Sequence, residues 1–194
     1  MGKEVFYLKT EHSIFRWKSE SLAHTKTMTG LALFTALYVL LNALTIQISP
    51  TLRISFSFVA LAISCRRYGF WPNVILCMAA DFLGYMVHPD GVYVPFFALI
   101  LVVKAFIYTQ LFYGKKQVGL WQVLLAQFLA DGIGNVLLNP LLLSVMYQMP
   151  YWVLVTSRLL KNACCYPFEC LALFAVLRLA FDRSQASKMH AKSR

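Results

Sequence analysis

The sequence has 194 residues, of which 59% are hydrophobic and 13% are charged, and its mean hydropathy is +0.62. Because a water-soluble domain carries roughly a quarter of charged residues, this composition excludes a soluble globule and indicates one domain in a lipid bilayer. The formal net charge is +10, but the basic residues lie between apolar segments and at the two ends, which excludes the continuous basic patch of a nucleic-acid-binding protein.

Six apolar segments follow a polar start. Residues 1–27 have no signal-peptide cleavage site before the first long apolar run, and they predict a cytoplasmic N-terminal tail. Residues 28–181 predict an all-α integral membrane domain, a bundle of six transmembrane helices, and residues 182–194 a basic cytoplasmic C-terminal tail. The predicted helices cover about residues 28–48, 54–70, 72–88, 92–113, 119–147 and 152–181.

Charge outside the predicted spans is strongly asymmetric. If the N-terminus lies inside, the inner segments collect nearly all of the lysines and arginines, and the outer loops keep only Arg53. Because basic loops remain in the cytoplasm, a single topology with both termini cytoplasmic is expected.

The first predicted helix carries Ala32 and Ala36 four residues apart. Small residues at this spacing allow two membrane helices to approach closely. Alanine is common, however, so the pair alone is a weak indication of a contact surface.

Polar side chains recur on single faces of the last three predicted helices. Residues at i, i+3 and i+4 share a helix face, so three stripes are expected to point into the bundle. They comprise Tyr93, Phe97, Lys104 and Tyr108 on the fourth helix, Gln127, Asp131, Asn135 and Asn139 on the fifth, and Arg158, Lys161, Asn162, Cys165 and Glu169 on the sixth.

The outer ends of these stripes are cationic. Arg158 and Lys161 lie in the outer half of the sixth helix, and Arg53 joins them from the first outer loop. Unpaired cations are costly in a low dielectric, so an anionic ligand is the simplest partner, and a carboxylate suits the geometry of arginine. Aromatic residues at the same level predict either a wall on which a flat ring stacks or an interfacial aromatic belt.

Three acidic residues within the spans, Asp81, Asp131 and Glu169, allow two interpretations. They could form interhelical hydrogen bonds and neutralise Lys104 or Lys161. They could instead be the ion sites of a self-sufficient ion-coupled transporter, although such carriers usually have internal repeats and none is visible. A lipid-modifying enzyme is a third possibility, but no nucleophile, metal-ligand cluster or phosphate-binding loop is present, and neither an enzyme nor a cofactor is predicted.

Six stretches of residues 26–180 resemble the substrate-binding S components of energy-coupling factor (ECF) vitamin transporters, and in particular the folate branch. The most specific are Leu-Arg-Ile-Ser-Phe-Ser-Phe at 52–58 and Thr-Ser-Arg-Leu-Leu-Lys-Asn at 156–162. The others are Ala-Asp-Phe-Leu-Gly at 80–84, Pro-Asp-Gly-Val-Tyr-Val-Pro-Phe-Phe at 89–97, Leu-Asn-Pro-Leu at 138–141 and Pro-Phe-Glu at 167–169.

The resemblance implies a six-helix subunit of the bacterial plasma membrane that captures folate at the outer face. Its partners would be a transmembrane coupling subunit, which Ala32 and Ala36 would contact, and two cytoplasmic ATPases. Another flat vitamin, such as riboflavin, thiamine or pantothenate, remains open at this point. The binding residues expected from the stripes and the resemblance together are Arg53, Tyr93, Phe97, Lys104, Asn135, Asn139, Arg158, Lys161 and Asn162.

Overall fold

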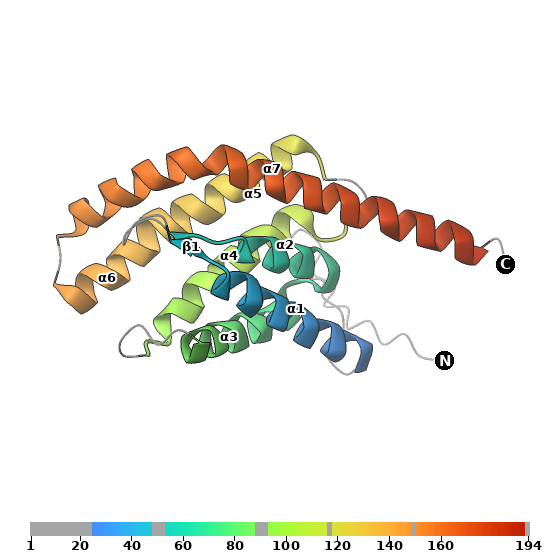
Figure 1. Ribbon diagram of the computed structural model, residues 1–194, viewed down its shortest axis with the longest axis horizontal. Coiled ribbons are helices and arrows are strands. Elements are labelled where there is room, and N and C mark those ends of the chain that lie inside the picture. The colour runs from blue at the N-terminus through green and yellow to red at the C-terminus, as the bar shows by residue number, and fades with distance from the viewer. Residues whose placement is uncertain (1–24, 48–52, 88–92, 116–117, 149, 193–194) are drawn as a thin grey trace, which may run out of the picture.

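The computed structural model describes residues 25–47, 53–87, 93–115, 118–148 and 150–192. The predicted N-terminal tail therefore lies outside the described residues, apart from its last three. The described chain is helical except for one pair of short strands (Figure 1). Its elements are α1 (Thr25–Ala43), β1 (Ile46–Gln47), β2 (Arg53–Ile54), α2 (Ser57–Tyr68), α3 (Phe70–Val87), α4 (Phe96–Phe112), α5 (Leu120–Leu129), the π-helix η1 (Ala130–Leu138), α6 (Asn139–Tyr147) and α7 (Tyr151–Lys192).

The expected all-α bundle of six membrane helices is confirmed, with α5, η1 and α6 joined end to end as the fifth helix. Within the described residues, four helices are long and apolar enough to cross a membrane: Thr25–Ala43, Phe70–Val87, Leu120–Met146 and Tyr151–Leu179. The apolar helix α4 is slightly shorter. The last helix continues to Lys192, beyond the predicted end at residue 181.

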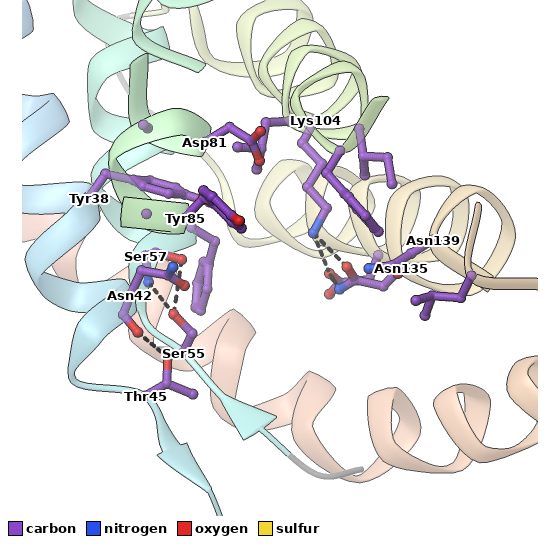
Figure 2. A pocket seen from close by; sticks show the side chains of 18 of the residues that line it. Tyr38, Asn42, Thr45, Ser55, Ser57, Asp81, Tyr85, Lys104, Asn135 and Asn139 are labelled. Atoms are coloured by element: carbon purple, nitrogen blue, oxygen red, sulfur yellow. Dashed lines mark hydrogen bonds and ion pairs between the residues drawn. The ribbon is translucent and has the colours of Figure 1, made fainter. Parts of the chain in front are cut away.

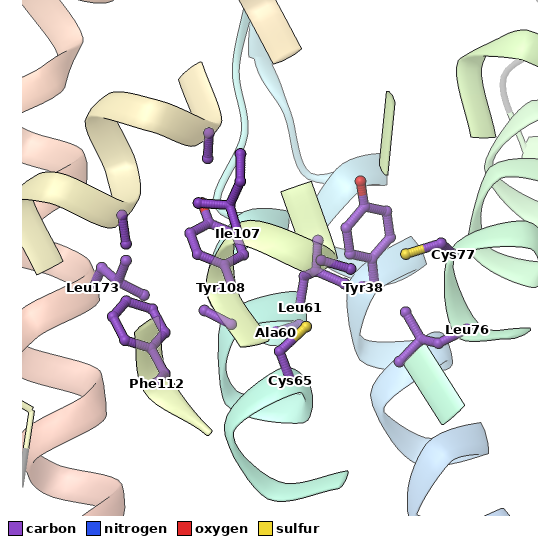
Figure 3. Packing of buried hydrophobic residues seen from close by; sticks show 14 of the residues in the cluster. Tyr38, Ala60, Leu61, Cys65, Leu76, Cys77, Ile107, Tyr108, Phe112 and Leu173 are labelled. Carbon is purple, nitrogen blue, oxygen red and sulfur yellow. The ribbon is translucent and has the colours of Figure 1, made fainter. Parts of the chain in front are cut away.

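Helix α2 is short, and most of its residues are buried between the other helices. Its 12 residues would rise only about 18 Å at 1.5 Å per residue, well below the thickness of the hydrocarbon core. Leu61, Ala62 and Cys65 are fully buried, and Figure 3 shows Leu61 and Cys65 of α2 between Tyr38 of α1 and Tyr108 of α4. The small residues of α2 allow its neighbours to approach closely.

A single residue, Gly69, separates α2 from α3. Its φ of 84° lies in the left-handed region, which glycine adopts without steric cost. The chain can therefore reverse at once, and Pro72 lies in the first turn of α3, where a missing amide hydrogen costs nothing.

The fifth helix widens in its middle. In η1 the hydrogen bonds follow the wider π pattern over Ala130–Leu138, where an uninterrupted α-helix was expected. Pro140, two residues after the end of η1, has no amide hydrogen to complete the α-helical ladder. Gly132 and Gly134 leave the backbone of η1 unrestrained. Wide turns of this kind occur frequently at functional sites.

The helices form two groups. Helices α1, α2, α3 and α4 pack on one another, whereas α7 lies along α5, η1 and α6. Figure 1 shows α7 running the length of the molecule beside the fifth helix, with α1 and α3 on the other side. Contacts of α4 with α5 and η1, and of α2 with α7, join the two groups.

Basic residues collect at one end of this bundle. The guanidinium of Arg66 donates hydrogen bonds to the carbonyl oxygens of Leu177 (3.2 Å) and Lys115 (3.5 Å). Arg66 thereby ties the end of α2 to α7 and to the turn after α4. The first turns of α1, with Lys26, lie at the same end, because Gly30 packs against the Tyr68 side chain at the end of α2. The described basic residues Lys26, Arg66 and Lys115 are therefore at one end of the bundle.

Candidate functional site

A cavity of about 720 Å³ lies between the two groups of helices. Its walls come from the C-terminal ends of α1, α3 and the fifth helix and from the N-terminal ends of α2, α4 and α7. These are the ends joined by the three predicted outer loops. A volume of this size is typical of sites for small organic ligands.

Eight of the nine residues expected to bind ligand line this cavity. They are Tyr93, Phe97, Lys104, Asn135, Asn139, Arg158, Lys161 and Asn162. The ninth, Arg53, has its backbone in β2, where it pairs with Gln47 of β1, but its side chain lies outside the described residues.

Arg158 and Lys161 stand out by their lack of partners. Both side chains are half-buried and lie close enough to repel each other. Neither has a hydrogen bond or an ion pair within the described part of the chain. Two adjacent cations that form no ion pair among the described residues create a positive field in the cavity wall, which an anionic group would neutralise.

Lys104, in contrast, is already engaged by the protein. Its ammonium donates a hydrogen bond to Asn135 Oδ1 (2.8 Å) and lies 3.9 Å from Asp131 Oδ1. Figure 2 shows the Lys104 side chain reaching from its helix to Asn135. The stem of Lys104 passes over Gly134, since a Cβ atom there would lie 2.5 Å from Lys104 Cε.

A hydrogen-bond network continues beneath Lys104. The side-chain amide of Gln127 donates to Asp131 Oδ2 and to Glu169 Oε2, both at 2.8 Å. Tyr108 donates to Gln127 Oε1 (2.9 Å), and Asn135 Nδ2 donates to Asp131 Oδ1 (2.8 Å). The network connects α4, the fifth helix and α7 through fully or partly buried groups, as the interhelical interpretation of Asp131 and Glu169 predicts.

The opposite wall contains polar residues that the sequence analysis did not select. Figure 2 shows Tyr38, Asn42 and Tyr85 on one side of the cavity and Lys104, Asn135 and Asn139 on the other. Ser55 and Ser57 lie next to Asn42, and the Ser55 hydroxyl accepts the backbone N–H of Ser57 (3.3 Å) at the start of α2. The serines belong to the stretch at 52–58, so a signal for them was present.

Aromatic rings line the same wall. The ring of Tyr93 lies 5.2 Å from that of Tyr85 and 5.8 Å from that of Phe82, centroid to centroid. Phe58 and Phe97 also face the cavity. The cavity therefore combines a cationic end on α7 with aromatic and amide surfaces, which suits a flat ring that carries an anionic tail.

The first helix presents Ala32 and Ala36 outside this cavity. Both are exposed, whereas Leu31, Thr35 and Tyr38 are buried against the bundle. The face of α1 that carries the two alanines is thus not covered by the other helices of the bundle.

Comparison with known proteins identifies a family. Residues 26–177 match the family model described as ECF transporter, substrate-specific component. The folate transporter FolT of Clostridium novyi is 32% identical over 144 residues, which cover 74% of this chain and 83% of the relative. The folate transporter FolT of Leuconostoc mesenteroides is 26% identical over 150 residues, which cover 75% and 80%.

A solved structure shares the fold. The crystal structure of FolT bound with folic acid superimposes with a TM-score of 0.71 at 26% sequence identity. The match covers 79% of this chain and 93% of that protein.

Proposed function

Because this chain belongs to the family of substrate-specific components of ECF transporters, we propose that it is the folate-binding subunit of such a transporter. Membership makes it a multi-pass membrane protein that binds a small molecule and works with ECF complex partners, and not an enzyme. Folate as the substrate, the outward position of the cavity and the individual contacts belong to the proposal.

The observation that carries the folate assignment is the unpaired pair of cations on α7. Folate ends in a glutamate with two carboxylates, and Arg158 and Lys161 offer two cations at one end of the cavity that have no ion pair among the described residues. Charge-assisted hydrogen bonds from arginine to a carboxylate are among the strongest available. Arg53 would add a third cation from the first outer loop.

The remainder of the cavity suits the pterin ring. Tyr93 and Phe97 provide aromatic faces, and Asn135 and Asn139 provide amide groups within reach of ring heteroatoms. Lys104 would hold Asn135 in place through their hydrogen bond, so its role would be to position the amide as well as to add charge. Asn162 also lines the cavity, and its Nδ2 atom is buried without a hydrogen-bond partner among the described residues.

Delivery would need the partners of the family. The chain would capture folate at the outer face and release it to the cytoplasm in a complex with a transmembrane coupling subunit and two cytoplasmic ATPases. Ala32 and Ala36 would contact the coupling subunit, because they are exposed small residues spaced for close helix packing. The termini would both be cytoplasmic.

Equilibrium binding to the purified chain tests the substrate. Isothermal titration in detergent should give saturable, one-to-one binding of folate at micromolar concentration or below. Riboflavin, thiamine and pantothenate serve as parallel ligands in the same detergent. Saturable binding of one of these vitamins together with no response to folate would overturn the assignment.

A further inference from the structure

Basic residues of three elements meet at the end of the bundle away from the cavity. Arg66, near the C-terminal end of α2, donates hydrogen bonds to the carbonyl oxygens of Leu177 (3.2 Å) and Lys115 (3.5 Å). Arg67 and Arg178 are the chain neighbours of these contacts. We call Arg66, Arg67, Lys115 and Arg178 the basic cluster, because α2, the turn after α4 and α7 bring them together.

No acidic side chain that the structure describes lies at this end. Asp81, Asp131 and Glu169 all line the cavity, at the other end of the helices. In the sequence, Asp182 and Arg183 follow the cluster on α7 and contribute no net charge. The basic cluster therefore carries a positive charge that no described carboxylate neutralises.

Two guanidinium groups of the cluster are placed by aromatic rings. Arg67 Cζ lies 5.7 Å from the centroid of the Tyr68 ring, and Arg178 Cζ lies 5.9 Å from that of the Phe174 ring. Both arginines are exposed, and neither has an ion pair or a hydrogen bond within the described part of the chain. A guanidinium donates hydrogen bonds in its own plane, so a ring against its face leaves the N–H groups open to an oxyanion.

The basic cluster also lies at the depth of lipid headgroups. The apolar spans Phe70–Val87 and Leu120–Met146 begin beside it, and the span Tyr151–Leu179 ends beside it. The second residue of each of the two spans that begin here is an exposed tryptophan: Trp71 is 55% exposed and Trp121 is 84% exposed. Tryptophan is typical of the interface between the hydrocarbon core and the headgroups, so phosphates of the bilayer lie within reach of the cluster.

We propose that the basic cluster binds the phosphate headgroup of an anionic phospholipid, such as phosphatidylglycerol or cardiolipin. Arginine pairs with a phosphate through two parallel hydrogen bonds, and basic pockets between membrane helices suit headgroups of this kind. Leu120 and Trp121, exposed beside the cluster, offer apolar surface to the acyl chains. A zwitterionic headgroup fits less well, because its own cation would face the arginines.

A bound headgroup would join the two groups of helices. Helix α2 packs with α1, α3 and α4, whereas α7 packs with the fifth helix. The lipid would therefore stabilise the bundle at the end opposite the cavity, in the cytoplasmic leaflet if the termini are cytoplasmic. The inference does not depend on folate, since it requires only that the chain lies in a membrane.

The test compares lipids and variants on the full chain in detergent. Native mass spectrometry counts bound phosphatidylglycerol, cardiolipin and phosphatidylcholine, all with oleoyl chains. The variants are Arg67→Gln, Arg178→Gln and the double variant, and Arg158→Gln is the control because it removes the same charge at the other end of the bundle. The unfolding midpoint in lipid-free detergent reports that each variant is folded.

The wild-type protein should retain one phosphatidylglycerol or cardiolipin molecule more tightly than phosphatidylcholine, and that lipid should raise the unfolding midpoint. Arg67→Gln and Arg178→Gln should each weaken this binding about fivefold, on the scale of one cation at an anionic surface, and the double variant more. Arg158→Gln should bind the lipid as the wild type does. Millimolar inorganic phosphate should not displace the lipid.

Three results would overturn the proposal. Equal retention of phosphatidylcholine would show that the phosphate alone does not select an anionic lipid here. Equal losses in Arg158→Gln and in the cluster variants would assign the effect to net charge rather than to this site. Displacement by inorganic phosphate would make the site one for a free anion. All of these measurements omit folate, so a failure of the folate assignment would leave them interpretable.

Discussion

Lys104 crosses from α4 to the fifth helix directly over Gly134, and its ammonium ends 2.8 Å from Asn135 Oδ1. The absence of a side chain at Gly134 provides the space for the lysine stem. The hydrogen bond between Lys104 and Asn135 therefore depends on a glycine that does not itself line the cavity.

Gly134→Ala should weaken folate binding. The new Cβ atom would lie 2.5 Å from Lys104 Cε and 3.2 Å from Lys104 Cγ, so the lysine must move away from Asn135. We expect a loss of about 1 kcal/mol or more in the free energy of binding, on the scale of one hydrogen bond to a charged group. The measurement is isothermal titration of folate.

Gly132→Ala is the matched control. It lies in the same π-helix, and a Cβ atom at this position meets nothing within 4 Å. Equal losses of affinity in the two variants would assign the effect to the backbone of η1 rather than to Lys104.

Gln127→Leu should destabilise the protein and disturb the hydrogen-bond network beneath Lys104. Gln127 is almost fully buried, and its amide nitrogen separates the carboxyl groups of Asp131 and Glu169. Leucine leaves two acidic groups and the Tyr108 hydroxyl without their shared partner, at a cost of about 2 kcal/mol or more. Thermal unfolding in detergent should show a lower midpoint for this variant.

Gln122→Leu, five residues earlier on α5, provides the comparison. Its Oε1 atom is buried without a hydrogen-bond partner among the described residues, so removal of the amide should cost little. A midpoint for Gln122→Leu as low as that of Gln127→Leu would refute the importance of the network.

Ala32→Trp and Ala36→Trp should separate binding from transport. Both alanines are exposed on α1 and do not line the cavity, so folate affinity of the purified chain should not change. A bulky ring prevents close helix packing, so uptake of labelled folate by cells with the complete transporter should fall strongly. Met78→Trp, at an exposed position of α3, is the control, and wild-type uptake by both alanine variants would contradict the proposed contact.

Labelling of single cysteines on intact cells should report the topology. In a background without the native cysteines, Gln148→Cys lies at the C-terminal end of α6, which we propose to be outside, and Lys115→Cys lies in the turn after α4. A membrane-impermeant maleimide should label position 148, and it should label position 115 only after the cells are opened. The reverse pattern would place the cavity on the cytoplasmic side.

Most of the bundle could be predicted from the sequence, because hydropathy distinguishes segments that lie in the membrane from segments exposed to water. The four longest spans and the polar stripes of the fifth and sixth predicted helices follow from the 3.6-residue period and the length of an apolar run. Helix α2 was expected to be longer, since hydropathy does not distinguish contact with lipid from contact with other helices. The π-helix was not expected either, because Pro140 and the two glycines allow a wide turn without requiring one.

The hydrogen-bond partners of individual side chains were harder to predict than the helix faces on which the side chains lie. The stripes place Lys104 and Asn135 in the bundle, but only the structure shows that they bind each other, whereas Arg158 and Lys161 have no ion pair within the described part of the chain. Tyr38, Asn42 and Tyr85 were missed because single polar residues near a helix end are ordinary in any membrane protein.

The most direct test of the account concerns the two unpaired cations on α7. Folate affinity should be measured by isothermal titration for the wild-type protein, Arg158→Ala, Lys161→Ala and Arg178→Ala. Arg178 is the control, because it lies on the same helix but is exposed and stacks near the ring of Phe174 (5.9 Å). Folate with both glutamate carboxylates esterified serves as the second ligand.

We predict that Arg158→Ala weakens folate binding by about 2 kcal/mol or more, which is about 30-fold, and that Lys161→Ala also weakens it. Neither change should affect the diester to the same extent, and Arg178→Ala should bind folate as the wild type does. Wild-type folate affinity in both Arg158→Ala and Lys161→Ala would contradict the account, because the cavity would then hold folate without the cations assigned to its carboxylates.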